Sequence, residues 1–340
     1  MRHVNIPVFI PHLGCPNLCV FCNQKAISGK TDFDDRYITE YADKTISDAL
    51  ETIEPDAQTE IAFFGGSFTG IDRTLMISLL KTAKKYVLRG DVSSIRLSTR
   101  PDYISEDILG ILAEYSVKYI ELGIQSMSDR VLELTRRGHT AADTERACRL
   151  IKRYRFSLIG QMMTALPGSS PADEIETAEK IVELGADGAR IYPTAVFART
   201  ELAEMTKRGE YNPPDSENII SRTADVLEVF LRAKVPVIKI GLHSGRDLYG
   251  SEGIISGTYD PSVGEQIMSR VMLNRIIHRL RGLETHEKIL FLEVPTGFTS
   301  ITSGKRKTNK TALCNGFGFR DVKISENPDL RPYTFNYTLS

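Results

Sequence analysis

Residues 119–163 read YIELGIQSMSDRVLELTRRGHTAADTERACRLIKRYRFSLIGQMM and contain two short apolar segments with a longer amphipathic segment between them. The apolar segments, Tyr119–Gly123 and Ser157–Met163, are nearly continuous, which is typical of strands buried on both faces of a parallel sheet. Between them, Ala141–Tyr154 has the periodicity of a helix. A strand, a crossing helix and a second strand form a parallel unit. This stretch therefore predicts an α/β fold.

The same alternation continues on both sides of this stretch. The other expected strands are Asn5–Ile10, Glu60–Phe64, Ser94–Ser98 and Ala189–Tyr192. The other expected helices are Tyr37–Ile53, Arg73–Leu88, Ser105–Tyr115 and Pro171–Gly185. Repeated strand–helix units in this number predict a partial (β/α)6 barrel of the TIM type, whose functional groups lie at the carboxyl ends of the strands.

The pattern changes after about residue 214. A helix is expected over 215–233, a strand within 235–245 and a helix over Gln266–Arg281. The last part contains two expected strands, Ile289–Val294 and Asp321–Ile324, separated by a basic loop and a short helix. We therefore expect a core of residues 1–214, an extension of that core over 215–283, and a small α/β tail domain over 284–340 that carries the basic loop.

Three cysteines, Cys15, Cys19 and Cys22, follow the first expected strand with the spacing C-x3-C-x2-C. Three thiolates this close in sequence can bind the irons of a cubane iron–sulfur cluster. Structural iron–sulfur and zinc sites usually have four protein ligands, so a set of three leaves one iron open for a cofactor or substrate. The alternative is a structural metal site completed by His12 or by a distant cysteine.

The composition excludes several classes of protein. The net charge of −1 excludes a surface that is strongly basic as a whole, so contact with nucleic acid requires a local patch. No apolar run approaches the roughly 18 residues of a membrane span, and the N-terminus lacks the pattern of a signal peptide, so we expect a cytoplasmic protein. The two cysteines outside the cluster motif, Cys148 and Cys314, are expected to be small buried apolar residues.

Further motifs follow the later strands. They are Gly65-Gly66-Ser67, Ser98-Thr99-Arg100-Pro101-Asp102, Gln125-Ser126 and Leu166-Pro167-Gly168. Because the carboxyl ends of parallel strands meet at one edge of a sheet, we expect these motifs to line one site together with the cysteines. Adjacent glycines there let a ligand approach the backbone closely.

The three-cysteine motif, with Phe21 before its last cysteine, resembles that of the radical S-adenosylmethionine (SAM) superfamily. The resemblance implies a [4Fe–4S] cluster whose open iron binds SAM, reductive cleavage of SAM to a 5′-deoxyadenosyl radical, and hydrogen abstraction from a substrate. It also implies an external electron donor such as ferredoxin or flavodoxin, and no membrane partner. The glycine pair resembles the family's motif for the methionine amine.

Residues 120–140 resemble the radical domain of the Elongator catalytic subunit and, more distantly, oxygen-independent coproporphyrinogen oxidases. In the latter group a glutamine and an arginine at matching positions contact the cofactor, which here implies roles for Gln125 and Arg137. The alternative for Arg137 is an exposed position at a helix start, beside an exposed Arg136. Glu121 lies within an apolar strand and requires either a role in the site or a buried partner. His139 is consistent with either packing or function.

The expected site residues fall into two groups. The expected metal ligands are Cys15, Cys19 and Cys22, and the expected cofactor-binding residues are Phe21, Gly65, Gly66, Ser67, Ser98, Arg100, Glu121, Gln125, Arg137 and Gln161.

The Elongator resemblance covers about residues 7–213 and has clear departures. The first two cysteines are closer together here, Ala165 stands in place of the usual glycine, and the tail is too short for an acetyltransferase domain. Formation of carboxymethyl-uridine is therefore not implied. An RNA base is the favoured substrate, and the enzyme alternatives are a small metabolite or porphyrin and a protein side chain. A non-catalytic nucleic-acid-binding protein with a structural metal is the alternative from another class.

The tail contains the basic stretch Ser303-Gly-Lys-Arg-Lys-Thr-Asn-Lys310. It faintly resembles the Gly-x-x-Gly loop with which KH domains bind a nucleic-acid backbone, with Lys307 in place of the second glycine. The alternative is a solvated charged turn.

Overall fold

A computed structural model describes residues 3–10, 14–15, 19–23, 37–54, 56–242, 253–257 and 260–340 of the chain. His12, the alternative fourth metal ligand, lies outside these residues. The described part divides into two compact units. Unit 1 comprises Met1–Pro214 and Phe230–Tyr259, and unit 2 comprises Asp215–Val229 and Asp260–Ser340. Residues 260–283 therefore lie in the same unit as the tail.

Unit 1 is built on a seven-stranded parallel sheet with the order β1-β2-β3-β4-β5-β6-β8. The strands are β1 (His3–Phe9), β2 (Gln58–Phe64), β3 (Ser94–Thr99), β4 (Val117–Gln125), β5 (Ser157–Thr164), β6 (Gly188–Pro193) and β8 (Val237–Ile240). Six of them are the strands expected for the partial barrel, and β8 falls within the strand expected over 235–245. The sheet is curled into a half-barrel, so the predicted partial barrel of the TIM type is confirmed.

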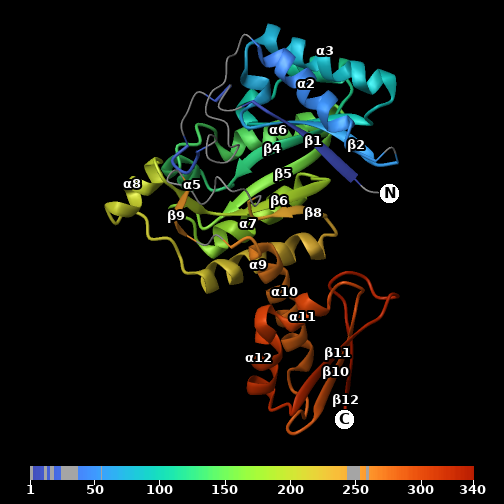
Figure 1. Cartoon of the computed structure of the whole chain (residues 1–340). Coiled ribbons are helices and arrows are strands. Elements are labelled where there is room, and N and C mark those ends of the chain that lie inside the picture. The colour runs from blue at the N-terminus through green and yellow to red at the C-terminus, as the bar shows by residue number, and fades with distance from the viewer. Residues whose placement is uncertain are drawn as a thin grey trace. The chain divides into compact units, whose positions relative to one another are not determined.

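Helices connect these strands. They are α2 (Ile38–Leu50), α3 (Arg73–Arg89), α4 (Glu106–Glu114), α5 (Asp129–Leu134), α6 (Ala141–Arg153), α7 (Pro171–Glu183), α8 (Glu201–Lys207) and α9 (Ser216–Arg232), of which α9 lies largely in unit 2. Figure 1 shows α2 and α3 side by side at the β1–β2 end of the sheet. A small antiparallel pair, β7 (Ala195–Phe197) with β9 (Ile254–Gly257), completes the described part of unit 1.

Unit 2 has its own sheet and core. Its strands have the order β11-β10-β12, where β10 is Ile289–Val294, β11 is Asp321–Glu326 and β12 is Asn336–Leu339. Its further helices are α10 (Val263–Leu280), α11 (Thr299–Ser303) and α12 (Thr308–Phe317). Leu290, Leu292 and Val294 of β10 are buried in an apolar cluster with residues of α10 and α12. Strand β10 and helices α10 and α12 therefore share an apolar core within unit 2.

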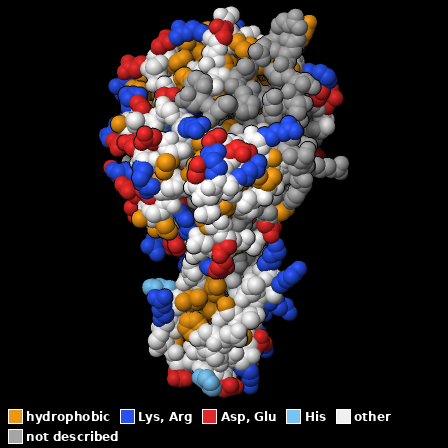
Figure 2. Space-filling model, turned by 90° about the vertical axis from the view of Figure 1, so that its left-hand side faces the viewer, with side chains coloured by type: hydrophobic (Ala, Val, Ile, Leu, Met, Phe, Trp, Pro, Cys, Tyr) orange, Lys and Arg blue, Asp and Glu red, His pale blue; other side chains and the backbone are white. Residues whose placement is uncertain are grey.

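The described helices include none that is long and apolar enough to span a membrane. On the face shown in Figure 2, lysine and arginine side chains are interspersed with aspartate and glutamate side chains over much of the surface. This mixture agrees with the net charge of −1.

Candidate functional site

The segment that carries Cys15 packs directly on the end of β2. The Cys15 Sγ and Ser67 Oγ atoms are 3.3 Å apart. Gly14 has a φ of +72°, and a Cβ there would lie 2.2 Å from the Ser67 carbonyl oxygen. Only glycine fits at this close approach of two backbones. Gly14 was not among the expected site residues, although its position directly before the first cysteine was a visible signal.

Backbone hydrogen bonds fix the segment around Cys19. The Val20 amide donates to the Thr135 carbonyl over 3.2 Å, and the Leu202 amide donates to the Val20 carbonyl over 2.7 Å. Cys22 closes a turn by donating its amide to the Cys19 carbonyl over 3.0 Å. Phe21 packs against an apolar cluster that includes Val20 and Leu202. The cysteine segment is thus anchored to residues far away in sequence.

Arg137 is buried beneath Cys19, with only 6% of its surface exposed. Its Nη1 donates to the Cys19 Sγ over 3.1 Å, and its Nη2 donates to the Gly123 carbonyl over 2.6 Å. Its Nε has no hydrogen-bond partner, and among the described residues no carboxylate lies within ion-pairing distance. The alternative of an exposed Arg137 is therefore wrong. By contrast, Arg136 is exposed and faces Glu201 at 3.6 Å.

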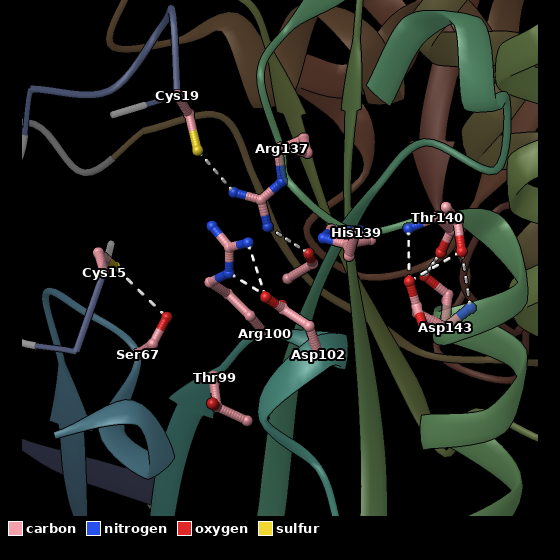
Figure 3. A network of polar contacts seen from close by, with 12 residues as sticks. Cys15, Cys19, Ser67, Thr99, Arg100, Asp102, Arg137, His139, Thr140 and Asp143 are labelled. Atoms are coloured by element: carbon pink, nitrogen blue, oxygen red, sulfur yellow. Dashed lines mark hydrogen bonds and ion pairs between the residues drawn. The ribbon is translucent and has the colours of Figure 1, made fainter. Parts of the chain in front are cut away.

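Arg100 approaches the same space from the end of β3. It is 3% exposed, and its Nε and Nη2 donate to the two Asp102 oxygens over 3.0 and 2.9 Å. Its Nη1 has no partner. Figure 3 shows the guanidinium groups of Arg100 and Arg137 on the side toward Cys15 and Cys19, and Arg100 interacts electrostatically with both cysteines. Asp102 belongs to the expected strand-end motif, although it was not among the expected cofactor-binding residues.

Gln125 ends β4 in a strained conformation. Its φ is +67°, and the ladder between β4 and β5 shifts register between Gly123 and Gln125. Its Oε1 is buried without a partner. A Cβ at Gly123 would lie 3.1 Å from the Gln125 Nε2 and 3.3 Å from the Arg137 Nη2, so this glycine leaves room for both side chains. Strain of this kind often marks a functional position.

His139 lies behind the two arginines, just before α6. It is 5% exposed, and its Nε2 is 3.3 Å from the Ile124 carbonyl, to which it must donate. Its Nδ1 has no partner. Burial, together with the positive charge of Arg137, lowers the pKa of His139 to about 4. The ring is therefore neutral at physiological pH.

Glu121 belongs to a second polar group, inside the half-barrel. Its Oε1 accepts from the Arg96 Nη1 and the Arg190 Nη2, both over 2.9 Å, and its Oε2 accepts from the Gln161 Nε2 over 2.8 Å. Arg96 also donates to Glu60 over 2.7 Å. The structure thus supplies the buried partners that Glu121 requires. Glu60 and Arg96 were not among the expected residues. Their charges within apolar strands were the signal that could have identified them.

The remaining predicted residues lie at or near the strand ends. Gly65 has a φ of +100° and a Cβ there would come within 3.2 Å of the Ile10 backbone, while Gly66 follows it. Ser98 is paired with Glu121 in the ladder between β3 and β4. Gln161 joins the Glu121 group. Within the described ranges, no three histidine, cysteine, aspartate or glutamate side chains converge as a metal site.

The buried polar atoms without hydrogen-bond partners indicate what kind of ligand fits the site. Arg100 Nη1 and Arg137 Nε are buried donors that require an acceptor, and Gln125 Oε1 is a buried acceptor that requires a donor. A ligand with a carboxylate and an amino or hydroxyl group satisfies all three. An anionic thiolate or cluster beside Arg137 would also compensate its buried charge. The residues present therefore fit both an iron–sulfur cluster and an amino-acid-like cofactor.

Comparison with known families agrees with this chemistry. A family model described as the radical SAM superfamily matches residues 9–181, and one described as the radical SAM C-terminal domain matches residues 186–273.

Individual relatives match over part of their length. The chain is 35% identical over 142 residues to an uncharacterized protein of Methanocaldococcus jannaschii, covering 41% of this chain and 44% of that protein. It is 25% identical over 252 residues to the tRNA uridine(34) acetyltransferase of Dehalococcoides mccartyi, covering 65% and 55% respectively. The chain thus spans about half the length of these curated relatives.

A solved structure has the same fold. The archaeal Methanocaldococcus infernus Elp3 with an N-terminal deletion gives a TM-score of 0.61 at 21% identity, covering 82% of this chain and 63% of that chain.

Proposed function

Because the chain belongs to the radical SAM superfamily, we propose that Cys15, Cys19 and Cys22 hold its [4Fe–4S] cluster at the mouth of the half-barrel. The chain is a radical SAM enzyme, and its cofactors are this cluster and SAM. When bound, they supply a one-electron cleavage of SAM into methionine and a 5′-deoxyadenosyl radical that abstracts a substrate hydrogen.

The residues of this chain bind and orient SAM. Arg137 and Arg100 donate from their free Nε and Nη1 atoms to its carboxylate or ribose oxygens, and Gln125 accepts from a hydroxyl or amino group through its free Oε1. The backbone at Gly65 and Gly66 offers polar groups to the methionine amine. Both arginines are almost fully buried, so their guanidinium groups lie away from bulk water, where their interactions with a charged ligand are stronger.

One observation carries this proposal. Arg137 is a buried cation without a carboxylate partner in the described part of the chain, and it donates directly to a cysteine of the three-cysteine motif. An uncompensated buried charge is costly, so a bound anion at this place explains its presence.

We propose an RNA base as the substrate. The support is the similarity to a tRNA uridine(34) acetyltransferase and the basic stretch of unit 2. The reducing electron comes from an external protein donor of the ferredoxin or flavodoxin type. RNA and such donors are available in the cytoplasm, which we propose as the location.

Anaerobic reconstitution with iron and sulfide tests the cluster. The wild-type protein should become brown, with a broad visible absorbance, and its spectrum should change when SAM is added. Changing Cys15, Cys19 or Cys22 to Ala should abolish the cluster, because each change removes an iron ligand.

The matched control variants are Cys148→Ala and Cys314→Ala. Cys148 is fully buried, and its burial raises the pKa of its thiol to about 12, which makes it a poor ligand. Full iron content in Cys19→Ala, or loss of iron in Cys314→Ala, would overturn the assignment. A colourless protein that retains zinc would instead favour the non-catalytic alternative.

A further inference from the structure

Unit 2 carries a strongly basic loop between α11 and α12. The loop comprises Gly304, Lys305, Arg306 and Lys307, and Lys310 lies in the first turn of α12. From Val294 to Phe319 the chain contains four lysines and arginines and no aspartate or glutamate. The charge is therefore concentrated locally, although the chain as a whole is nearly neutral.

The loop has a defined conformation. Gly304 has a φ of +79°, and a Cβ there would lie 2.5 Å from the Thr308 Oγ1 and 2.8 Å from the Asn309 amide nitrogen. Asn309 is 5% exposed, and its Nδ2 donates to the Ser269 Oγ over 2.9 Å and to the Thr302 carbonyl over 3.2 Å. These contacts hold both ends of the loop against α10 and α11.

The four cations differ in their surroundings. Lys305 is paired with Asp260 and also reaches the Ser262 hydroxyl, and its hydrogen bond keeps the pKa of Asp260 well below the usual range. Arg306 and Lys307 are exposed and Lys310 is half-buried. In the described part of the chain, no carboxylate pairs with Arg306, Lys307 or Lys310. Lys305 is therefore occupied by Asp260, and the other three are available to a ligand.

In the absence of a ligand, the backbone conformation and the charges of the basic loop are energetically unfavourable. Arg306 and Lys307 have φ values of 54° and 63°, a left-handed conformation that costs about 1 kcal/mol or more per residue. The positive end of the α12 dipole repels nearby cations. The first turn of α12 has no acidic residue, and no side chain caps it. A bound anion would offset each of these costs.

We propose that Arg306, Lys307 and Lys310 bind the sugar–phosphate backbone of single-stranded RNA. The inference rests on the proposed RNA substrate and assigns it a binding site in unit 2. Two exposed cations adjacent in the chain, with a third one turn further on, suit a polymer with repeated phosphates better than a single anion. Contacts of this kind bind RNA without reading its sequence.

Filter binding of mixed-sequence RNA oligomers at several salt concentrations tests the site. Arg306→Ala/Lys307→Ala should weaken binding almost equally for all sequences. The slope of log affinity against log salt should become shallower by about 0.7 for each phosphate that the variant no longer neutralises. Adding Lys310→Ala should weaken binding further, and Lys305→Ala should have a smaller effect because Asp260 already occupies that lysine.

The matched control is Arg320→Ala/Arg331→Ala, which removes the same charge from exposed positions of the same unit. Equal losses of affinity in the control and loop variants, or no loss in the loop variant, would overturn the proposal. If the wild type binds RNA but the loop variant binds it equally well, the loop proposal is wrong and the proposal of an RNA substrate is retained. If the wild type does not bind RNA, both the loop proposal and the RNA substrate are wrong. Iron content and the SAM-induced spectral change test the radical SAM site separately.

Discussion

At the scale of single residues, alanine variants test the proposal that Arg137 and Gln125 bind SAM. Changing either to Ala should leave the cluster intact, because neither is an iron ligand. Loss of a hydrogen bond to a charged group should weaken SAM binding by about 1.5–3 kcal/mol. Equilibrium binding of SAM to the reconstituted variants measures this effect.

Arg136→Ala is the control for that experiment. Arg136 is adjacent in sequence but exposed, and it faces Glu201 instead of the cysteines. Its removal should leave SAM affinity unchanged. If the Arg137 and Gln125 variants also bind SAM like the wild type, the roles implied by the coproporphyrinogen oxidases belong to other residues.

His139 should make the stability of the protein depend on pH. Its pKa is lowered from 6.5 to about 4 in the folded state, so the unfolded chain binds the proton more tightly. Stability is therefore lost as the pH falls from 6.5 toward 4, and by pH 5 the loss is about 2 kcal/mol.

Urea unfolding of wild type and His139→Gln at pH 7 and pH 5 measures this loss. The variant should lose about 2 kcal/mol less than the wild type between the two pH values, because glutamine does not titrate. An identical loss in both proteins would mean that His139 does not titrate below its ordinary range.

At the scale of elements, the repeated strands and helices of unit 1 were predictable from periodicity alone. Strand β4 was expected over Tyr119–Gly123 and extends over Val117–Gln125, while β10 was expected with its observed bounds. The short helix α5 was not predicted, because six residues carry little periodic signal. Strand β12 was not predicted either, because its pairing with β10 is a tertiary contact.

The site was predictable in its residue types but not in its contacts. The strand-end motifs indicated Arg100 and Gln125, and the resemblance to coproporphyrinogen oxidases implied roles for Gln125 and Arg137. That Arg137 donates to Cys19, 118 positions away in sequence, depends on how α5 and the cysteine segment pack. Ala165 has a φ of +59°, which explains why glycine is usual at this position.

Helix α7 offers a test of local stability. Ser170 and Asp173 form a capping box, in which the Asp173 amide donates to the Ser170 Oγ over 3.2 Å and the Ser170 amide donates to Asp173 over 2.8 Å. Ser170→Ala should lower the free energy of unfolding by about 1 kcal/mol, as judged by urea unfolding. Ser170→Thr keeps the hydroxyl and should lose much less. Equal losses in the two variants would argue against the cap.

At the scale of the whole molecule, the two proposed activities belong to two compact units, so we expect each activity to survive loss of the other. The Arg306→Ala/Lys307→Ala protein should cleave SAM at the wild-type rate when RNA is absent. Conversely, Cys19→Ala should bind RNA with wild-type affinity. The rate of 5′-deoxyadenosine formation measures SAM cleavage, and filter binding measures the affinity for RNA. A loop variant that loses iron, or a Cys19 variant that loses RNA affinity, would show that the two units depend on each other.

The unpaired charge of Arg137 also has a consequence for the life of the protein in a cell. Filling the site with anionic groups adds binding free energy to the native state only. When the chain is synthesised faster than iron and sulfide are supplied, more of it remains without the cluster. This less stable form unfolds more often and is degraded sooner. The cellular amount of this protein, in addition to its activity, should therefore rise and fall with the supply of iron.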